Sequence, residues 1–442
     1  MERKPEMKRS VGFAQGLAIV VGMIIGSGIF LKPSIVLKDA GSPVVALAAW
    51  ILGGIVTLAS ALSIAEIASN IPKSGGLYVD LQEIYDEKVG FLLGWVQSVI
   101  SYPASVAAQA IAFAVYADYF VPMDDGVQRL VAIGVMLLLL GLNILSTRCG
   151  GIIQVVATVG KLVPVAAILG VGLLRGQAPG ASGLSSGLIG NAGTAVLGTL
   201  WAYDGWIGVT NMAGEMKNPK KNLPKVIFIG ITFVIIVYAL FNIVLFNVLP
   251  AEQLANSAAP GAEVAVALFG PSGAAFLTAG ILISVFGSLN GYLMTAARVP
   301  QAMSQRNLLP MSGILGKLHP KFGTPANALI MQTVLAAVYV LSGSFNALTD
   351  LLVFVLWIFF TLGVCGIFRL RRAGRSDPGG YRVPLYPLTP IVGIVGSVFI
   401  LVSTVWSNPL RSILGISITV LGLPVYFWLK KHNKGEKENP NE

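Results

Sequence analysis

Three ionisable side chains lie inside long apolar stretches of this chain, namely Glu66, Lys161 and Asp204. A charge within a hydrocarbon layer is costly, and it marks a pathway or a binding site by default. The three are spread over separate stretches, whereas a membrane enzyme would need them clustered. The two histidines, His319 and His432, lie outside the apolar stretches. We therefore expect no enzyme, no metal site and no cofactor, and no nucleotide loop of Walker type is present.

Two apolar stretches are interrupted by residues that loosen a helix. The stretch VVGMIIGSGIF (20–30) contains Gly26-Ser27-Gly28, and GTLWAYDGWIGV (198–209) contains Asp204-Gly205. Irregular backbone at membrane depth is tolerated only where it lines a cavity or is buried in protein. Close helix packing through small residues is the alternative. Two interruptions at matching places favour a binding site.

The chemistry of such a site follows from the backbone. N–H groups near Ser27-Gly28-Ile29 would lack intrahelical partners and would suit a carboxylate. Carbonyl groups near Met23-Ile24-Ile25, and near Trp201-Ala202-Tyr203, would suit an ammonium group. A ligand with an anionic and a cationic end about one carbon apart fits this arrangement. The sequence therefore predicts an α-amino acid bound through its backbone.

These interruptions must be held by membrane helices. The chain has 442 residues, of which 55% are hydrophobic and 11% charged, against about 25% charged residues in soluble domains. We expect an all-α polytopic protein of the cell membrane. Twelve stretches are long enough to span a bilayer: 11–37, 43–70, 89–118, 127–147, 152–174, 191–213, 225–249, 264–304, 325–342, 346–370, 388–407 and 411–430. The eighth is long enough to project into the cytosol.

The basic residues predict the orientation. Most of the 30 Lys and Arg residues fall on one side of the alternating spans. The other side holds Lys32, Lys38, Arg129, Arg175 and Arg411. The positive-inside rule places both termini in the cytosol. The net charge of +10 is explained by this rule, so no nucleic-acid partner is expected.

The interrupted first and sixth spans open two five-span halves. The predicted parts are a cytosolic N-terminus (1–10), a first repeat (11–174), a second inverted repeat (191–370), two further helices (388–430) and a cytosolic tail (431–442). The segments 71–88 and 305–324 are expected to form cytosolic amphipathic helices. The charged tail is expected to be disordered.

Several motifs together resemble one family. They are GMIIGSGIF, AEIASNIPKSGGLY, GKLVP, WAYDGW followed by GEMKNPKKNLP, and YPLTP. This set resembles the L-type transporters of the amino acid–polyamine–organocation superfamily. The resemblance implies the inverted repeat, and sodium-independent amino acid exchange by alternating access. Animal members carry a cysteine between the third and fourth spans that bonds a partner glycoprotein. The loop YFVPMDDGVQ (119–128) has none, so we expect a stand-alone, bacterial-type member without a disulfide-linked heavy chain.

The resemblance also suggests a role for Lys161. In related folds that use sodium, a cation lies between the first and eighth spans. The Lys161 ammonium would replace it, donating to carbonyls of the first span and to Ser284 or Ser288. Proton coupling through a buried lysine is an alternative, and a lysine that extends to the interface is another.

The remaining site residues shape the pocket. We expect Trp201 to cover the substrate and Trp206 to pack. Asp204 caps the second half of the sixth span or, alternatively, faces a cationic substrate. Glu66 is expected to anchor 71–88. Limited room favours Ala, Ser or Thr as substrate, with a pocket formed by Ile24, Ile25, Gly26, Ser27, Gly28, Ile29, Trp201, Ala202, Tyr203, Asp204 and Phe286.

Alternatives to exchange of small neutral amino acids stay open at this point. They are a proton-coupled symporter, an exchanger of cationic or larger amino acids, and an amino acid-sensing membrane receptor.

Overall fold

The computed structural model describes residues 9–71, 73–175, 192–257, 259–342, 345–374, 379–407 and 409–438. Within these ranges the regular structure is helical, apart from an isolated parallel bridge between Val11 and Met216. The helices are α1 Phe13–Ile24, α2 Gly28–Ala40, α3 Pro43–Asn70, α4 Leu77–Ile84, α5 Glu87–Val96, the π-helix η1 Gln97–Ser101, α6 Tyr102–Ala117, α7 Asp125–Leu145, α8 Thr147–Arg175, α9 Ala192–Ala202, α10 Gly208–Asn211, the 3-10 helix η2 Ala213–Glu215, α11 Pro219–Val248, α12 Ala251–Asn256, α13 Pro260–Ala296, α14 Arg298–Ser304, α15 Ser312–Leu315, α16 Ala326–Ser342, α17 Phe345–Arg372, α18 Leu388–Ser407, α19 Pro409–Val420 and α20 Gly422–Glu438.

Among the described residues, ten helical segments are long and apolar enough to cross a membrane. Two further apolar helices, α9 and α16, are shorter. The prediction of an all-helical, multi-pass membrane protein is confirmed. The count of twelve spans and the inverted repeat stay predictions.

The first predicted span forms two separate helices in the structure. α1 ends at Ile24 and α2 begins at Gly28, so the interruption lies where the Gly-Ser-Gly stretch predicts it. α2 ends at Ala40, and Gly41 after it adopts the left-handed conformation (φ 70°) that glycine allows at a helix C-terminus. The next residue caps α3, because the Ser42 hydroxyl accepts from the Val45 N–H at 3.3 Å.

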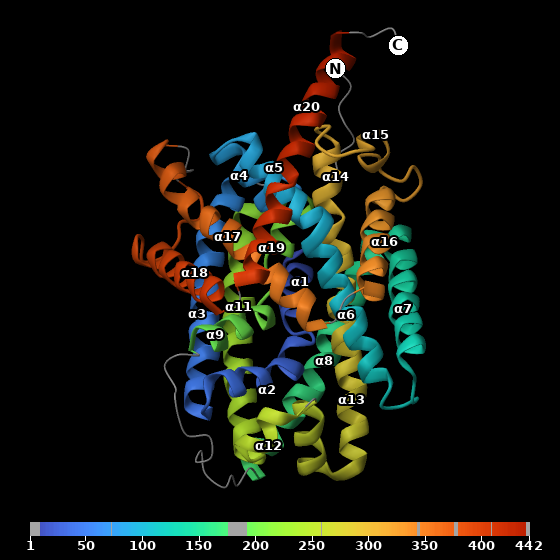
Figure 1. Cartoon of the computed structure of the whole chain (residues 1–442), viewed down its shortest axis with the longest axis vertical. Coiled ribbons are helices and arrows are strands. Elements are labelled where there is room, and N and C mark those ends of the chain that lie inside the picture. Colours follow the sequence, from blue (N-terminus) through green and yellow to red (C-terminus); the bar gives the residue numbers. More distant parts are fainter. Residues whose placement is uncertain are drawn as a thin grey trace.

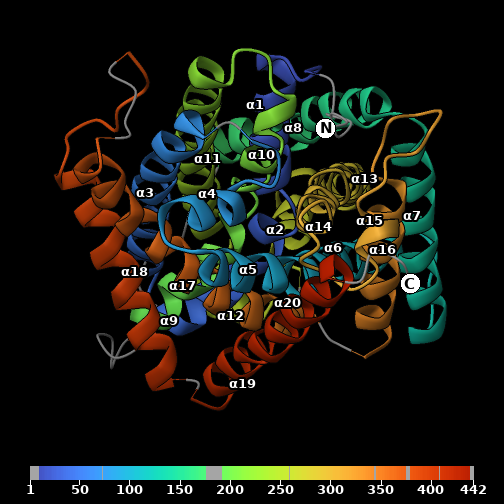
Figure 2. The same cartoon turned by 90° about the horizontal axis from the view of Figure 1, so that it is seen from above.

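The broken helices lie inside the bundle. Seen from above, α2 lies near the centre of the bundle, whereas α18 and α19 lie at the periphery (Figure 2). α8 runs parallel to α1. Gln154 and Thr158 both donate to the Ala18 carbonyl, and Lys161, further along α8, donates to Gly22, further along α1. The end of the molecule that carries α4, α14 and α15 also carries α20 (Figure 1).

Two details of the sequence prediction are wrong. The segment 305–324 contains only the four-residue α15, because its Gly and Pro residues favour turns. The tail is helical as far as Glu438, since α20 continues through 431–438. Its last four residues lie outside the described residues.

The predicted eighth span is interrupted at both ends. Gly270 has non-helical backbone angles (φ 72°) within α13, and α14 begins after Ala297. These interruptions account for its length.

Candidate functional site

The break in the first span leaves polar groups without partners. Among the described residues, the backbone N–H groups of Ser27, Gly28 and Ile29 make no hydrogen bond. The Ser27 hydroxyl is buried and also lacks a partner. On the other side of the break, the Met23 carbonyl oxygen accepts no hydrogen bond from any described residue. Buried polar groups are normally paired, so these groups indicate a place for a polar ligand.

The sixth span is also broken, and its break lies against the first. α9 ends at Ala202 and α10 begins at Gly208, with Gly205 at φ 106° between them. A side chain at Gly205 would lie 2.9 Å from the Met23 Cβ atom. A side chain at Gly28 would lie 2.6 Å from the Ala202 Cα atom. Glycine at both positions allows the two backbones to meet.

A tyrosine that the sequence reasoning missed joins the two breaks. The Tyr238 hydroxyl of α11 lies 2.8 Å from the carbonyl oxygens of both Ile24 and Ala202. Tyr238 is fully buried and packs against Tyr203, with ring centroids 5.1 Å apart. The Tyr203 hydroxyl in turn donates to the Trp50 carbonyl at 3.0 Å. No sequence pattern marks a tyrosine in a long apolar span as such a bridge.

Lys161 has three acceptors for its three protons. Its Nζ lies 2.7 Å from Gly22 O, 2.5 Å from Ile25 O and 3.1 Å from Ser288 Oγ. Ser288 donates to Gly22 O at 2.7 Å, and Ser284 donates to Ile25 O at 3.1 Å. The ammonium therefore lies between α1 and α13. It uses the carbonyls of Gly22 and Ile25, which are then not available to a ligand.

Asp204 is buried, with 8% of its surface exposed. It accepts from the Tyr292 hydroxyl at 2.8 Å. The residue that precedes α10 is Ile207, and no side chain caps that helix. The predicted cap is therefore wrong, because Tyr292 of α13, which the sequence reasoning did not consider, engages the carboxylate.

The aromatic residues at the sixth-span break are both buried. Trp201 is 4% exposed and Trp206 is 1% exposed. The Trp206 ring packs against Phe360, with centroids 5.2 Å apart. Ile24, Ile25 and Ile29 are also buried around the break in the first span.

The ring of Phe286 contacts α6, and its predicted place in the pocket stays a prediction. Ser284 and Ser288 contact α1, and Phe286 lies two residues from each, on another face of α13. Its ring packs against Phe113 of α6, with centroids 6.3 Å apart. Gln109 of α6, which the sequence reasoning missed, lies closer to the break. Its Nε2 would be 2.9 Å from a side chain at Gly26, and its Oε1 is buried without a partner.

Glu66 was predicted to anchor 71–88, but its carboxylate makes no hydrogen bond to the described residues of that segment. Its carboxylate accepts from Arg371 at 2.9 and 2.8 Å and from the Val383 N–H at 2.6 Å. It therefore links α3 to the end of α17 and to the segment that precedes α18. Arginine pairs with a carboxylate in this bidentate way because its N–H groups match the two oxygens.

Comparison with known proteins identifies the family. The model of the amino acid permease family matches residues 11–429. The chain is 39% identical over 427 residues to the serine/threonine exchanger SteT of Bacillus subtilis (strain 168), which covers 96% of this chain and 98% of that protein. It is 32% identical to large neutral amino acids transporter small subunit 2 of Mus musculus, over 95% of this chain and 81% of that protein. It is 30% identical to the human cystine/glutamate transporter, over 97% and 88% of the two chains. The chain therefore belongs to the amino acid permease family, among the L-type amino acid transporters that its motifs resemble.

Proposed function

We propose that the protein exchanges small neutral L-amino acids, such as Ala, Ser and Thr, across the cell membrane by alternating access and without sodium. The observation that carries this proposal is the pair of broken helices, with free N–H groups at Ser27, Gly28 and Ile29. They suit a substrate carboxylate, and the Met23 carbonyl suits the ammonium group. The name of the serine/threonine exchanger relative supports the substrate class.

Within this proposal, Lys161 takes the place of a coupling sodium ion. Its three acceptors match the three donors of an ammonium group. That match supports a fixed connection between α1 and α13 rather than a proton carrier, which would need a second site to receive the proton. Lys161 is fully buried, so it does not extend to an interface.

The surroundings of Asp204 support a neutral substrate. Its carboxylate already accepts from Tyr292. A substrate with a cationic side chain would have to compete with this bond. We therefore place the substrate between Ile24, Ile25, Gly26, Ser27, Gly28 and Ile29 of the first break and Trp201, Ala202, Tyr203 and the backbone around Asp204 of the second.

The proposed architecture has twelve spans, two inverted five-span repeats and two further helices, with both termini in the cytosol. The contact between the breaks of the first and sixth spans supports it, because such repeats place their broken helices at a common site. We propose that the protein works without a heavy chain, since Cys149 and Cys365 are its only cysteines.

The test is uptake of labelled serine into proteoliposomes. Vesicles are preloaded with each of the twenty amino acids in turn, with and without sodium, and at equal or unequal pH. We expect uptake only against internal small neutral amino acids, without dependence on sodium or on the pH gradient. Uptake into empty vesicles driven by a proton gradient would replace the proposal with a symporter. Stronger exchange against internal Arg or Leu than against Ala would overturn the substrate class. Serine binding without any uptake would indicate a receptor.

A further inference from the structure

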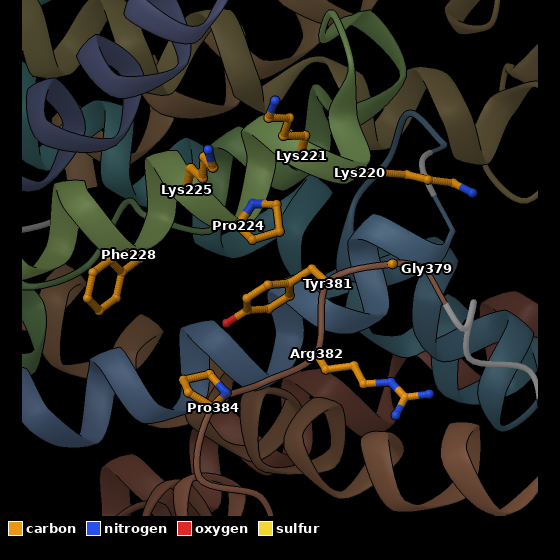
Figure 3. A pocket seen from close by; sticks show the side chains of 10 residues that line it. Lys220, Lys221, Pro224, Lys225, Phe228, Gly379, Tyr381, Arg382 and Pro384 are labelled. Carbon is orange, nitrogen blue, oxygen red and sulfur yellow. The ribbon is translucent and has the colours of Figure 1, made fainter.

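A groove separate from the broken helices lies where α11 begins. We call it the α11 groove. It has a volume of about 630 Å³ and lies between the first turns of α11 and the segment that precedes α18. It is lined by Lys220, Lys221, Pro224, Lys225, Phe228, Gly379, Gly380, Tyr381, Arg382 and Pro384. Figure 3 shows the α11 residues and the segment 379–384 on its two sides.

The lining residues of the α11 groove carry four basic side chains and no acidic one. Lys221, Lys225 and Arg382 are exposed, and their side chains make no hydrogen bond or ion pair within the described residues. Basic side chains normally gain from a nearby carboxylate, and the described lining residues include none. The groove therefore suits an anion.

The α11 groove also has an apolar wall. Pro224, Phe228 and Pro384 contribute to it, and Phe228 is 48% exposed. Exposed apolar side chains continue along α11 from Phe228 to Ile229 and Ile236. α11 belongs to a candidate membrane span, Pro219–Val248. This surface would lie against lipid chains, while the lysines at the beginning of the helix would lie at headgroup level.

The Tyr381 hydroxyl provides a further polar contact. Its oxygen is buried and has no hydrogen-bond partner among the described residues. In Figure 3 the ring lies between the α11 side of the groove and Pro384. The hydroxyl points toward Phe228 in Figure 3, so it would donate to a ligand oxygen that lies beside the apolar wall.

We propose that the α11 groove binds the phosphate-bearing headgroup of an anionic membrane phospholipid, with an acyl chain along Phe228. Basic pockets between membrane helices hold such headgroups. A soluble phosphate would use the basic side chains but not the apolar surface that continues from them along α11. The proposal concerns a lipid site and does not depend on which amino acid is transported.

The first test compares two double variants with the same loss of charge. Lys221→Gln/Lys225→Gln removes two basic groups four residues apart on α11, whose side chains line the groove and whose ends point away from Tyr381 in Figure 3. Lys317→Gln/Lys321→Gln removes two exposed basic groups with the same spacing elsewhere. Delipidated full-length protein in neutral detergent is titrated with fluorescent phosphatidylglycerol and, separately, with fluorescent phosphatidylcholine.

We expect wild type and the control variant to bind phosphatidylglycerol in preference to phosphatidylcholine. The groove variant should bind phosphatidylglycerol about tenfold more weakly or worse, while its serine exchange stays intact as a check on folding. Equal binding by groove and control variants would overturn the proposal, as would equal affinity for the two lipids.

The second test separates a lipid from a free anion. Phe228→Gln removes the apolar wall next to the headgroup. It should weaken binding of phosphatidylglycerol, and millimolar inorganic phosphate should not displace the lipid from wild type. Full displacement by phosphate, together with unchanged lipid affinity in Phe228→Gln, would show a free-anion site and would overturn the lipid proposal.

Discussion

At the scale of single residues, Lys161 donates from its ammonium group to two carbonyls beside the break. Lys161→Ala leaves Gly22 and Ile25 with the hydroxyls of Ser288 and Ser284 alone, and each lost hydrogen bond from a charged donor costs about 1.5–3 kcal/mol. We expect the maximal exchange rate to fall at least about tenfold, with a smaller change in serine affinity. Exchange should also become less dependent on internal substrate. The measurement is the initial rate in loaded and empty proteoliposomes, with the exposed Lys38→Ala as control. Wild-type rates in Lys161→Ala would remove this role.

Gly28 offers a second test, because the backbone of Ala202 lies against it. In Gly28→Ala the new Cβ would lie 2.6 Å from the Ala202 Cα, so the two breaks must separate. We expect serine exchange to fall by more than about tenfold, although alanine is the better helix former by about 1 kcal/mol. Gly134→Ala is the matched control, since nothing lies within 4 Å of a Cβ there. Normal exchange in Gly28→Ala would contradict the close contact of the two breaks.

At the scale of the helices, a buried ion pair joins the end of the sixth span to the end of the eighth. Glu215 and Arg298 are each 2% exposed, with 2.9 Å between Oε1 and Nε. Glu215→Gln leaves the buried guanidinium with neutral partners only, and breaking a buried pair costs about 3–5 kcal/mol. We expect a clear loss of melting temperature, and a smaller loss in Glu215→Gln/Arg298→Met. Glu83→Gln is the control, because the exposed pair of Glu83 with Lys73 contributes at most about 1 kcal/mol. If the melting temperature falls equally in Glu215→Gln and Glu83→Gln, the buried pair has no special role in stability.

The helices also show how far sequence reasoning reaches. Gly-Ser-Gly and Asp-Gly mark the two breaks because few residues tolerate irregular backbone at that depth. Tyr238 could not be predicted, since its role depends on which carbonyls α11 meets after folding. The predicted pocket role of Phe286 stays a prediction. Two residues of helix turn a side chain by about 200°, so Phe286 lies on another face of α13 than Ser284 and Ser288.

At the scale of the whole molecule, the orientation in the membrane can be tested with the cysteines. Cys149 is exposed near the beginning of α8, which lies beside the beginning of α1, and Cys365 is half-buried. The proposed cytosolic N-terminus places Cys149 in the cytosol too. In a Cys365→Ser background, we expect a membrane-impermeant maleimide to label Cys149 in inside-out vesicles and not in intact cells. The reverse pattern would invert the topology.

The gap in the first span also suggests why the carrier would not change conformation without a bound substrate. Closing both gates over a vacant break would seal the N–H groups of Ser27, Gly28 and Ile29 and the Ser27 hydroxyl away from water without partners. Each such group costs about 1–3 kcal/mol, and a bound amino acid removes part of that cost. The same backbone groups that bind the substrate would then also raise the barrier to the return of the empty carrier. Obligatory exchange would follow from these unsatisfied hydrogen bonds and would need no separate regulatory element.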